Sequence, residues 1–242
     1  MRRHGGRCAA STRRIKVGTW VMSNPHRNPT LTAKVAETLD EIADGRFVFG
    51  FGIGSSGDEM TAFGFEQDHI YSRFKEALDI ILPLLRDGKT THNGTFYSAQ
   101  DLELRPRGPS AGTMPLLLGT RGPKAMRLAA THADIWSWFA TESSQPEAFV
   151  EALADLDRAC VDVGRDPNDI GRSLGVFVEP TEETGVAKWG LGEPIHGSTT
   201  EIADTLRRFA DMGVTHLELW PWPQNLESLE ALAPVLAELD AT

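Results

Sequence analysis

The sequence has little cysteine, no long apolar run and no excess of positive charge, and each shortage excludes a class of protein. Only two of its 242 residues are cysteines, Cys8 and Cys160, and no CxxC pair occurs, which indicates a reducing compartment, the cytoplasm. No apolar run approaches the ~18 residues of a membrane helix. The formal net charge of −10 argues against nucleic acid or an anionic membrane surface as a partner.

The amino-terminal stretch, residues 1–13, is basic but has no apolar segment, so it does not read as a secretory signal. We expect an irregular leader or the remnant of a helix there. Cys160 falls on the apolar side of a helical pattern and is expected to be a buried small hydrophobic residue.

What the sequence does contain is an alternation of β-type runs and helical patterns. Strands are predicted at 14–22, 46–54, 115–119, 134–139, 172–179 and 215–221. Helices are predicted at 29–44, 71–87, 123–132, 146–163, 198–213 and 225–239. Such alternation predicts a parallel sheet covered by helices, either an open doubly wound sheet or a (β/α)₈ barrel lacking about two units.

Local signals mark several boundaries. Asn28 is expected to cap the helix that starts at Pro29, in which Leu31, Val35, Leu39 and Ile42 share one face. Pro83 is expected to kink the helix over 71–87. Asn93-Gly94 predicts a small hairpin, and Ser198 with Glu201 predicts a capping box.

Two glycine clusters follow predicted strands, at the edge where parallel α/β folds place their ligands. Gly119-Thr120-Arg121-Gly122 precedes Pro123 and a helix start, so its backbone N–H groups and the helix dipole favour an anion such as phosphate. The alternative is a plain strand–helix turn. The cluster over 50–57 either lets a flat ring lie against the backbone or forms a flexible loop or β-bulge.

The order and spacing of six stretches resemble the bacterial luciferase-like monooxygenases, a family of flavin- or deazaflavin (F420)-dependent oxidoreductases. The stretches are 14–54, EMTAFGF at 59–65, 73–98, LRPRGP at 104–109, 116–136 and 199–221. The resemblance implies a luciferase-like (β/α)₈ TIM barrel in one domain over 1–242, truncated at the amino terminus to about six strand–helix units. Family members are commonly dimers, so a homodimer is expected.

The resemblance also implies a cofactor site for F420 or FMN. Its phosphate would lie on the turn of Gly119, Thr120, Arg121 and Gly122. A backbone distortion under the ring is expected at Thr19, Trp20 and Val21. The ring would lie near Gly52, Ile53 and Gly54.

No catalytic residue is assigned, and His26 and His69 are the weak candidates, because each lies in a loop that could reach the cofactor. His132 is interpreted as a cation at a helix end. Trp136 and Trp138 alternate on one strand and are expected mainly in the core. No metal-ligand cluster is found.

The function expected from these features is hydride transfer between F420, or FMN, and a small organic substrate. One alternative is a two-component FMN monooxygenase that uses O₂. Another is an inactive cofactor-binding fragment, because the first two units of the family are not expected here. A third is a phosphate-binding barrel enzyme of another kind, such as an isomerase.

Overall fold

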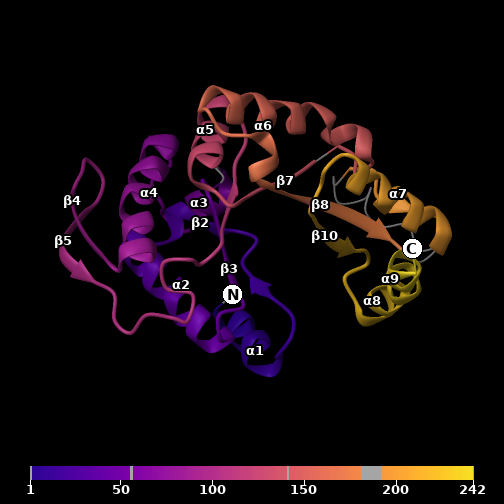
Figure 1. The fold of residues 1–242 in the computed structure, drawn as a ribbon, viewed down its shortest axis with the longest axis horizontal. Helices are drawn as coiled ribbons and strands as arrows, with labels where there is room; N and C mark the ends of the chain where they lie inside the picture. Colours follow the sequence, from indigo (N-terminus) through magenta and orange to yellow (C-terminus); the bar gives the residue numbers. More distant parts are fainter. Residues whose placement is uncertain (1, 55–56, 141, 181–191, 242) are drawn as a thin grey trace. The chain divides into compact units, whose positions relative to one another are not determined.

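The computed structural model describes residues 2–54, 57–140, 142–180 and 192–241. The chain forms two compact units, Met1–Asp134 and Ile135–Thr242, which are described in turn (Figure 1). The prediction of a single barrel domain over 1–242 stays a prediction.

The first unit is built on parallel strands. After α1 (Arg2–Ser11) come β1 (Val17–Gly18), β2 (Met22–Ser23), β3 (Phe47–Gly52) and β6 (Leu116–Gly119). Both β1 and β2 pair with β3, which pairs with β6 on its other side. The strand predicted over 14–22 is therefore present as two short pieces, and the Trp20–Val21 peptide bond between them is cis.

Four helices and one short 3₁₀ turn complete this part of the unit. They are η1 (Asn24–His26), α2 (Pro29–Ala43), α3 (Asp58–Ala62), α4 (Ile70–Asp87) and α5 (Pro123–His132). Asn28 caps α2 as predicted, because its side chain accepts a hydrogen bond from Thr30 N. The helix α4 continues through Pro83 to Asp87. The rings of Phe49, Phe51 and Phe74 stack in the core between β3 and α4.

The face that α2 buries is not the apolar face noted in the sequence. Leu31 and Ile42 are 46% and 44% exposed, whereas Glu37 and Asp40 are fully buried. Glu37 accepts from Arg107 Nε at 2.8 Å and from Gly108 N at 2.6 Å, and Asp40 accepts from Ser110 N at 2.7 Å. These bonds to the loop over 105–110 satisfy both oxygens of Glu37 and Oδ2 of Asp40, whereas Oδ1 of Asp40 has no hydrogen-bond partner among the described residues. Hydrogen bonds of this kind offset the cost of burying a carboxylate.

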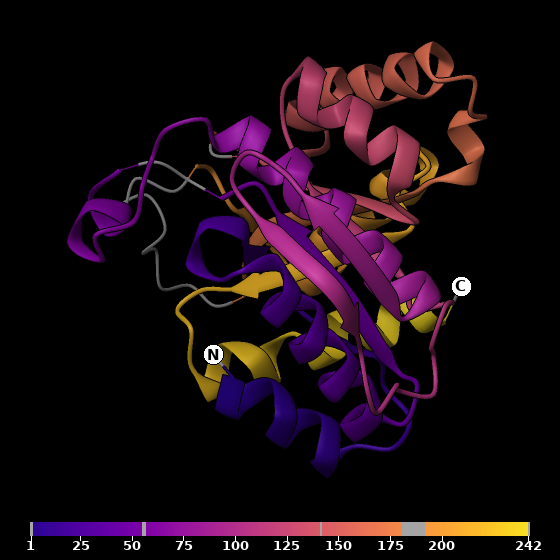
Figure 2. The same ribbon diagram turned by 90° about the vertical axis from the view of Figure 1, so that its left-hand side faces the viewer.

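The predicted hairpin is present as β4 (Lys89–Asn93) and β5 (Ser98–Glu103), which pair antiparallel alongside α4 (Figure 2). Its tip is held by Glu76 of α4. That carboxylate accepts from the backbone N–H groups of Thr95, Phe96 and Tyr97, the shortest bond being 2.7 Å. The turn is longer than Asn93-Gly94 alone, because Asn93 pairs with Ser98.

The second unit continues the alternation. Its strands are β7 (Ile135–Phe139), β8 (Gly171–Glu179), β9 (Ile195–His196) and β10 (His216–Pro221). The strands β7, β9 and β10 each pair in parallel with β8. Its helices are η2 (Pro146–Phe149), α6 (Val150–Asp162), η3 (Pro167–Asp169), α7 (Thr199–Asp211), α8 (Leu226–Ala231) and α9 (Ala233–Asp240). The expected helix over 225–239 is thus two helices, with Pro234 in the first turn of the second.

The core of the second unit contains Trp136 of β7, and Trp138 of the same strand is half-buried. Trp136 is 1% exposed, its ring centroid lies 6.5 Å from that of Trp138, and Trp138 packs edge-on against Phe149. Cys160 is buried as expected, and burial raises the pKa of its thiol. The capping box of Ser198 and Glu201 is confirmed. Each of the six predicted strand–helix units is present in the described part of the chain.

Candidate functional site

The predicted cofactor residues meet at one edge of the first unit. Ser23, Gly52 and Gly119 lie in register across β2, β3 and β6, at the carboxyl end of each strand. Consequently the segments that follow, which begin with Asn24, Ile53 and Thr120, leave the sheet side by side. This edge is where parallel sheets bind ligands.

The glycines of β3 make room for the distorted backbone at Thr19–Val21. The Thr19 hydroxyl donates to Gly50 O at 2.8 Å and accepts from Gly50 N at 3.1 Å. A Cβ on Gly50 would lie 1.7 Å from Thr19 O, and one on Gly52 would lie 2.4 Å from Val21 Cγ2. The sequence left open a flat ring against the backbone or a flexible loop or β-bulge, and neither describes Gly50 and Gly52. The Thr19–Val21 segment packs directly against these two glycines.

Val21 also packs against Gly119, the first glycine of the turn between β6 and α5. A Cβ on Gly119 would lie 3.2 Å from both methyl carbons of Val21. Val21 therefore packs between Gly52 and Gly119. A side chain at either of these two positions would displace it. A ring bound at this edge would meet the Thr19–Val21 segment, because Val21 already fills the space beside the glycines.

Gly54, in the cluster over 50–57, is equally restricted to glycine. Gly54 has φ +92°, and a Cβ there would lie 2.7 Å from Pro25 Cδ. Because both the backbone angle and the close approach of η1 require glycine, this position fixes where η1 lies relative to the end of β3. Ile53, just before it, is half-buried at the sheet edge.

The turn from β6 into α5 fits an anion. Gly122 is the N-cap with φ +80°, Pro123 is the first helical residue, and the first turn contains no acidic residue. A Cβ on Gly122 would meet nothing within 4 Å, so the backbone faces open space there. The N–H groups of a first helical turn have no helical partner, and the dipole makes them attractive to negative charge. The Arg121 side chain is exposed beside them and Thr120 is buried.

His26 and His69, the two weak catalytic candidates, lie in different surroundings. His26 is half-buried in η1, with its ring against Phe65 at 5.2 Å between centroids. The side chain of His69 is 64% exposed at the start of α4, with Asp68 at 3.8 Å and the Phe96 ring at 5.6 Å. A role for either in catalysis stays a prediction.

Sequence reasoning missed Asn24, Phe63 and Phe65 as neighbours of this edge. Asn24 is 2% exposed, although asparagine in a loop is usually solvated. Phe63 is 66% exposed and lies 6.0 Å from Phe65, centroid to centroid. The available signal was the sequence AFGF, an apolar group in an otherwise polar segment.

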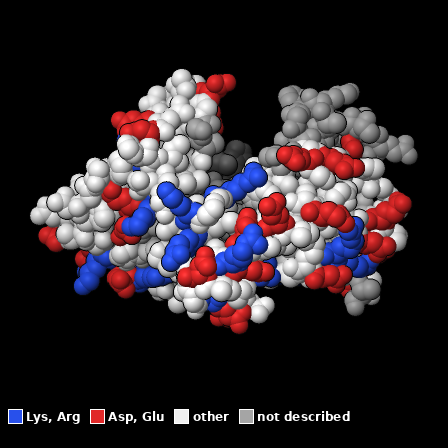
Figure 3. All heavy atoms as spheres, turned by 90° about the horizontal axis from the view of Figure 1, so that it is seen from above, with Lys and Arg blue, Asp and Glu red and all other residues white. Residues whose placement is uncertain are grey.

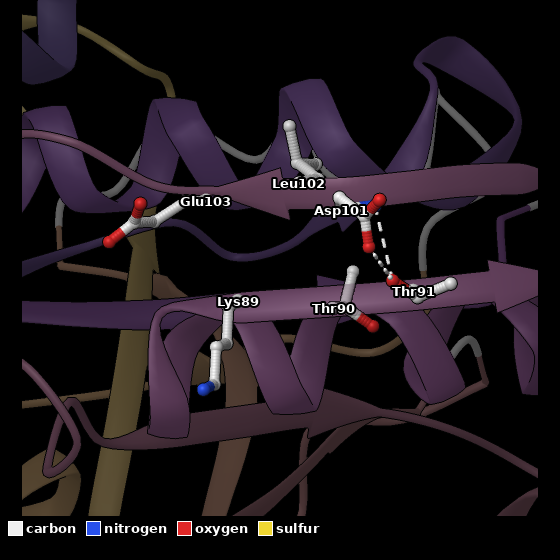
Figure 4. Close-up of a pocket in the computed structure, with 6 residues that line it drawn as sticks. All are labelled: Lys89, Thr90, Thr91, Asp101, Leu102 and Glu103. Carbon is white, nitrogen blue, oxygen red and sulfur yellow. Dashed lines mark hydrogen bonds between the residues drawn. The ribbon is translucent and has the colours of Figure 1, made fainter.

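Other features of the described residues lie away from this edge. A hollow of about 570 Å³ is lined only by the hairpin strands, where Thr91 and Asp101 are bonded to each other (Figure 4). Lys and Arg side chains are interspersed with Asp and Glu on the face in Figure 3. No described group of three His, Cys, Asp or Glu residues is arranged to hold a metal ion. No helix in the described ranges is long and apolar enough to cross a membrane.

Comparison with known proteins gives the same family that the sequence resembles. The family model described as luciferase-like monooxygenase matches residues 5–189. The chain is 32% identical over 197 residues to an F420-dependent glucose-6-phosphate dehydrogenase of Microbacterium testaceum, covering 78% of this chain and 57% of that one. It is 35% identical over 126 residues to a 4-hydroxyprotoasukamycin monooxygenase of Streptomyces nodosus, covering 51% of this chain and 34% of that one.

The fold has solved counterparts. A coenzyme F420-dependent tetrahydromethanopterin reductase from Methanopyrus kandleri superposes with a TM-score of 0.81 at 17% identity, covering 99% of this chain and 86% of that one. This likeness confirms the predicted luciferase-like α/β fold. The chain spans between about a third and three fifths of the length of the two curated relatives it matches.

Proposed function

The chain belongs to the luciferase-like monooxygenase family, and from that premise we propose that it is an oxidoreductase dependent on F420 or FMN, acting on a small organic substrate. The observation that carries the proposal is the meeting of the Thr19–Val21 segment, the end of β3 and the β6–α5 turn at one sheet edge. The F420-dependent dehydrogenase among its relatives supports the same class of reaction.

Three groups of residues would hold the cofactor. The turn of Gly119, Thr120, Arg121 and Gly122 would bind its phosphate through backbone N–H groups, the helix dipole and the guanidinium of Arg121. Thr19, Trp20 and Val21 would support the ring from one side, and Gly52, Ile53 and Gly54 would border it. When bound, the cofactor supplies hydride transfer to or from a substrate carbon.

The protein's own contribution in this proposal is position. The two hydrogen bonds between Thr19 and Gly50 and the packing of Val21 fix the supporting segment before any ligand arrives. A surface that is already fixed loses little conformational entropy on binding. The cationic side chains of Arg121 and Lys124 at the start of α5 attract the anion and orient it.

Gly119→Asp tests the phosphate turn directly. We expect this variant to lose binding of both FMN and F420, because its carboxylate lies against the bound phosphate. Gly119→Asn is the matched control, since it has the same size without the charge, and it should weaken binding less. The measurement is a fluorescence titration of each cofactor with each protein. Unchanged affinity in Gly119→Asp would remove the turn from the site.

A second candidate function is a two-component FMN monooxygenase that uses O₂, and the monooxygenase among the relatives favours it. The same titrations separate the two, because preference for F420 supports the dehydrogenase or reductase class and preference for FMN supports the monooxygenase. Binding of a cofactor without turnover of any substrate would support a cofactor-binding fragment instead.

A cytoplasmic location and a homodimer belong to the same proposal, together with a small-molecule substrate and no nucleic-acid partner. The low cysteine content and the formal charge of −10 support the location and the exclusion of nucleic acid. Sedimentation at several protein concentrations would test the dimer.

A further inference from the structure

Two buried polar atoms of η1 have no hydrogen-bond partner among the described residues. They are Oδ1 of Asn24, whose residue is only 2% exposed, and Nε2 of His26. A buried polar atom without a partner is destabilising, because it has lost its hydrogen bond to water and gained none in return. Two such atoms within one three-residue turn therefore need an explanation, and a bound group that hydrogen-bonds to them is one.

The position of η1 places these atoms beside the proposed cofactor edge. Asn24 directly follows Ser23, which lies in register with Gly52 at the end of β3. Pro25 lies against the backbone of Gly54, which would clash with it if it carried a Cβ. The turn is therefore fixed at the sheet edge and does not hang free of it.

An aromatic group adjoins the same turn. The His26 ring lies 5.2 Å from Phe65 and 6.5 Å from Phe63, the latter edge-on at 68°. Phe63 is 66% exposed, so its face is available to a ligand. Exposed aromatic surface next to unpartnered polar atoms is the usual composition of a site for a small organic molecule.

We propose that Asn24, His26, Phe63 and Phe65 form the substrate side of the site, and that the substrate is an oxygenated aromatic compound such as a phenol or aryl ketone. This inference rests on the proposed function, since it names the substrate class of the same site. The substrate ring packs on Phe63 and Phe65, and its oxygen hydrogen-bonds to His26 Nε2. Asn24 Oδ1 accepts a hydrogen bond from a second substituent or from a water carried with it. His26 thereby determines specificity, because it selects an aromatic compound that carries oxygen over one that does not.

Two aromatic probes of similar size test the assignment, 4-hydroxyacetophenone and ethylbenzene, titrated by calorimetry into the protein saturated with the cofactor that binds it. His26→Phe keeps an aromatic ring and removes the nitrogen. We expect this variant to bind 4-hydroxyacetophenone at least tenfold more weakly, with the affinity for ethylbenzene changed less than threefold. His216→Phe, at an exposed position of β10, is the matched control and should bind both probes as the parent does.

Phe63→Ala provides a second test that does not depend on His26. Because Phe63 is exposed, the variant should fold, and it should bind both probes more weakly. The affinity for FMN or F420 should be unchanged in His26→Phe and Phe63→Ala. Equal affinity of the parent and His26→Phe for 4-hydroxyacetophenone, or no saturable binding by the parent, would overturn the inference.

The cofactor titration separates this inference from the proposed function. Failure of both cofactors to bind the parent protein contradicts the proposed function alone. The probes are then titrated into the protein without cofactor, with the ¹⁵N resonances of the His26 ring as the readout. A shift of Nε2 with 4-hydroxyacetophenone and not with ethylbenzene supports the site, and no shift with either overturns it.

Discussion

The distorted backbone at Thr19–Val21 determines which residue types fit at the neighbouring positions of the sheet edge. Gly50 and Gly52 are required because the backbone of Thr19 and the side chain of Val21 occupy the space where a Cβ would be. Glycine is the residue that permits such close approach of two backbone segments. The glycines of β3 thus support the proposed cofactor surface, which the Thr19–Val21 segment mainly forms.

Gly50→Ala is expected to destabilise the protein by about 1–3 kcal/mol, the usual cost of forcing extra volume into a packed core. Its Cβ would lie 1.7 Å from Thr19 O, a backbone atom that cannot rotate away. Gly6→Ala in α1 is the control, because nothing lies within 4 Å of its Cβ and alanine favours a helix by about 1 kcal/mol. Urea unfolding measures both changes. Equal stability of Gly50→Ala and the parent would contradict the packing described here.

The sequence predicted which residues lie at this edge, but it did not predict the contacts that require glycine there. Glycines at 50, 52 and 119 follow from their place at strand ends, but their contacts with Val21 depend on a backbone distortion that no periodicity reveals. His132 shows the converse. It lies in the last turn of α5 as expected, yet burial and the nearby Arg86 lower its pKa, which disfavours the charged form at that helix end.

At the scale of elements, short polar contacts decide where loops and hairpins lie. The hairpin tip is attached to α4 through Glu76. Burial alone would raise the pKa of this carboxyl, but the N–H groups of Tyr97, Phe96 and Thr95 bind its charged form and hold the pKa below its usual value. The stability that Glu76 provides is therefore present above the unfolded-state pKa and is lost as the pH falls through the lower folded-state value.

Glu76→Gln should release the hairpin tip. Glutamine has one acceptor oxygen for three N–H donors, and hydrogen bonds to a charged group contribute about 1.5–3 kcal/mol. We expect a loss of this order at neutral pH and faster hydrogen exchange at the amides of Thr95, Phe96 and Tyr97. Asp79→Asn, which removes an exposed ion pair with Lys75, is the control and should change stability by less than about 0.5 kcal/mol. Unchanged exchange at the three amides would contradict the role given to Glu76.

The helix α2 shows why such contacts escape sequence patterns. Its leucines and isoleucine suggested one face, but the face it buries contains Ala33, Ala36, Glu37 and Asp40. Small residues allow the helix to approach closely, and the two carboxylates accept hydrogen bonds from a loop about 70 residues later in the chain. Periodicity predicts that a helix forms, whereas a partner distant in sequence decides which face is buried.

For the whole molecule, the order of strands and helices was predictable because each unit repeats the same local signals. A helix follows each of the six predicted strands in the described residues, and boundaries such as Asn28, Pro123 and Ser198 follow from backbone chemistry. The substrate side was not predictable, since Asn24, His26, Phe63 and Phe65 come together only when η1 and the segment after α3 are placed in space.

Two features make the stability of the protein depend on pH, namely its negative net charge and the buried carboxyl of Glu218. Burial raises the pKa of Glu218 on β10, and the hydroxyl of Ser173, which donates to it, offsets only part of the effect. Because the folded-state pKa is the higher one, the folded protein binds more protons between the two values. Stability therefore falls as the pH rises from the unfolded-state pKa through the folded-state pKa. The formal charge of −10 adds self-repulsion over the same range.

Glu218→Gln separates these two causes when it is compared with Glu230→Gln, an exposed carboxyl of α8. Both variants remove one negative charge, so both relieve self-repulsion, but only Glu218→Gln removes the buried group. We expect Glu218→Gln to gain stability relative to the parent as the pH rises from 5 to 8, and Glu230→Gln to gain much less. Urea unfolding at each pH measures the difference. Parallel curves for the two variants would mean that net charge alone governs the dependence and that Glu218 is ionised in the folded protein without cost.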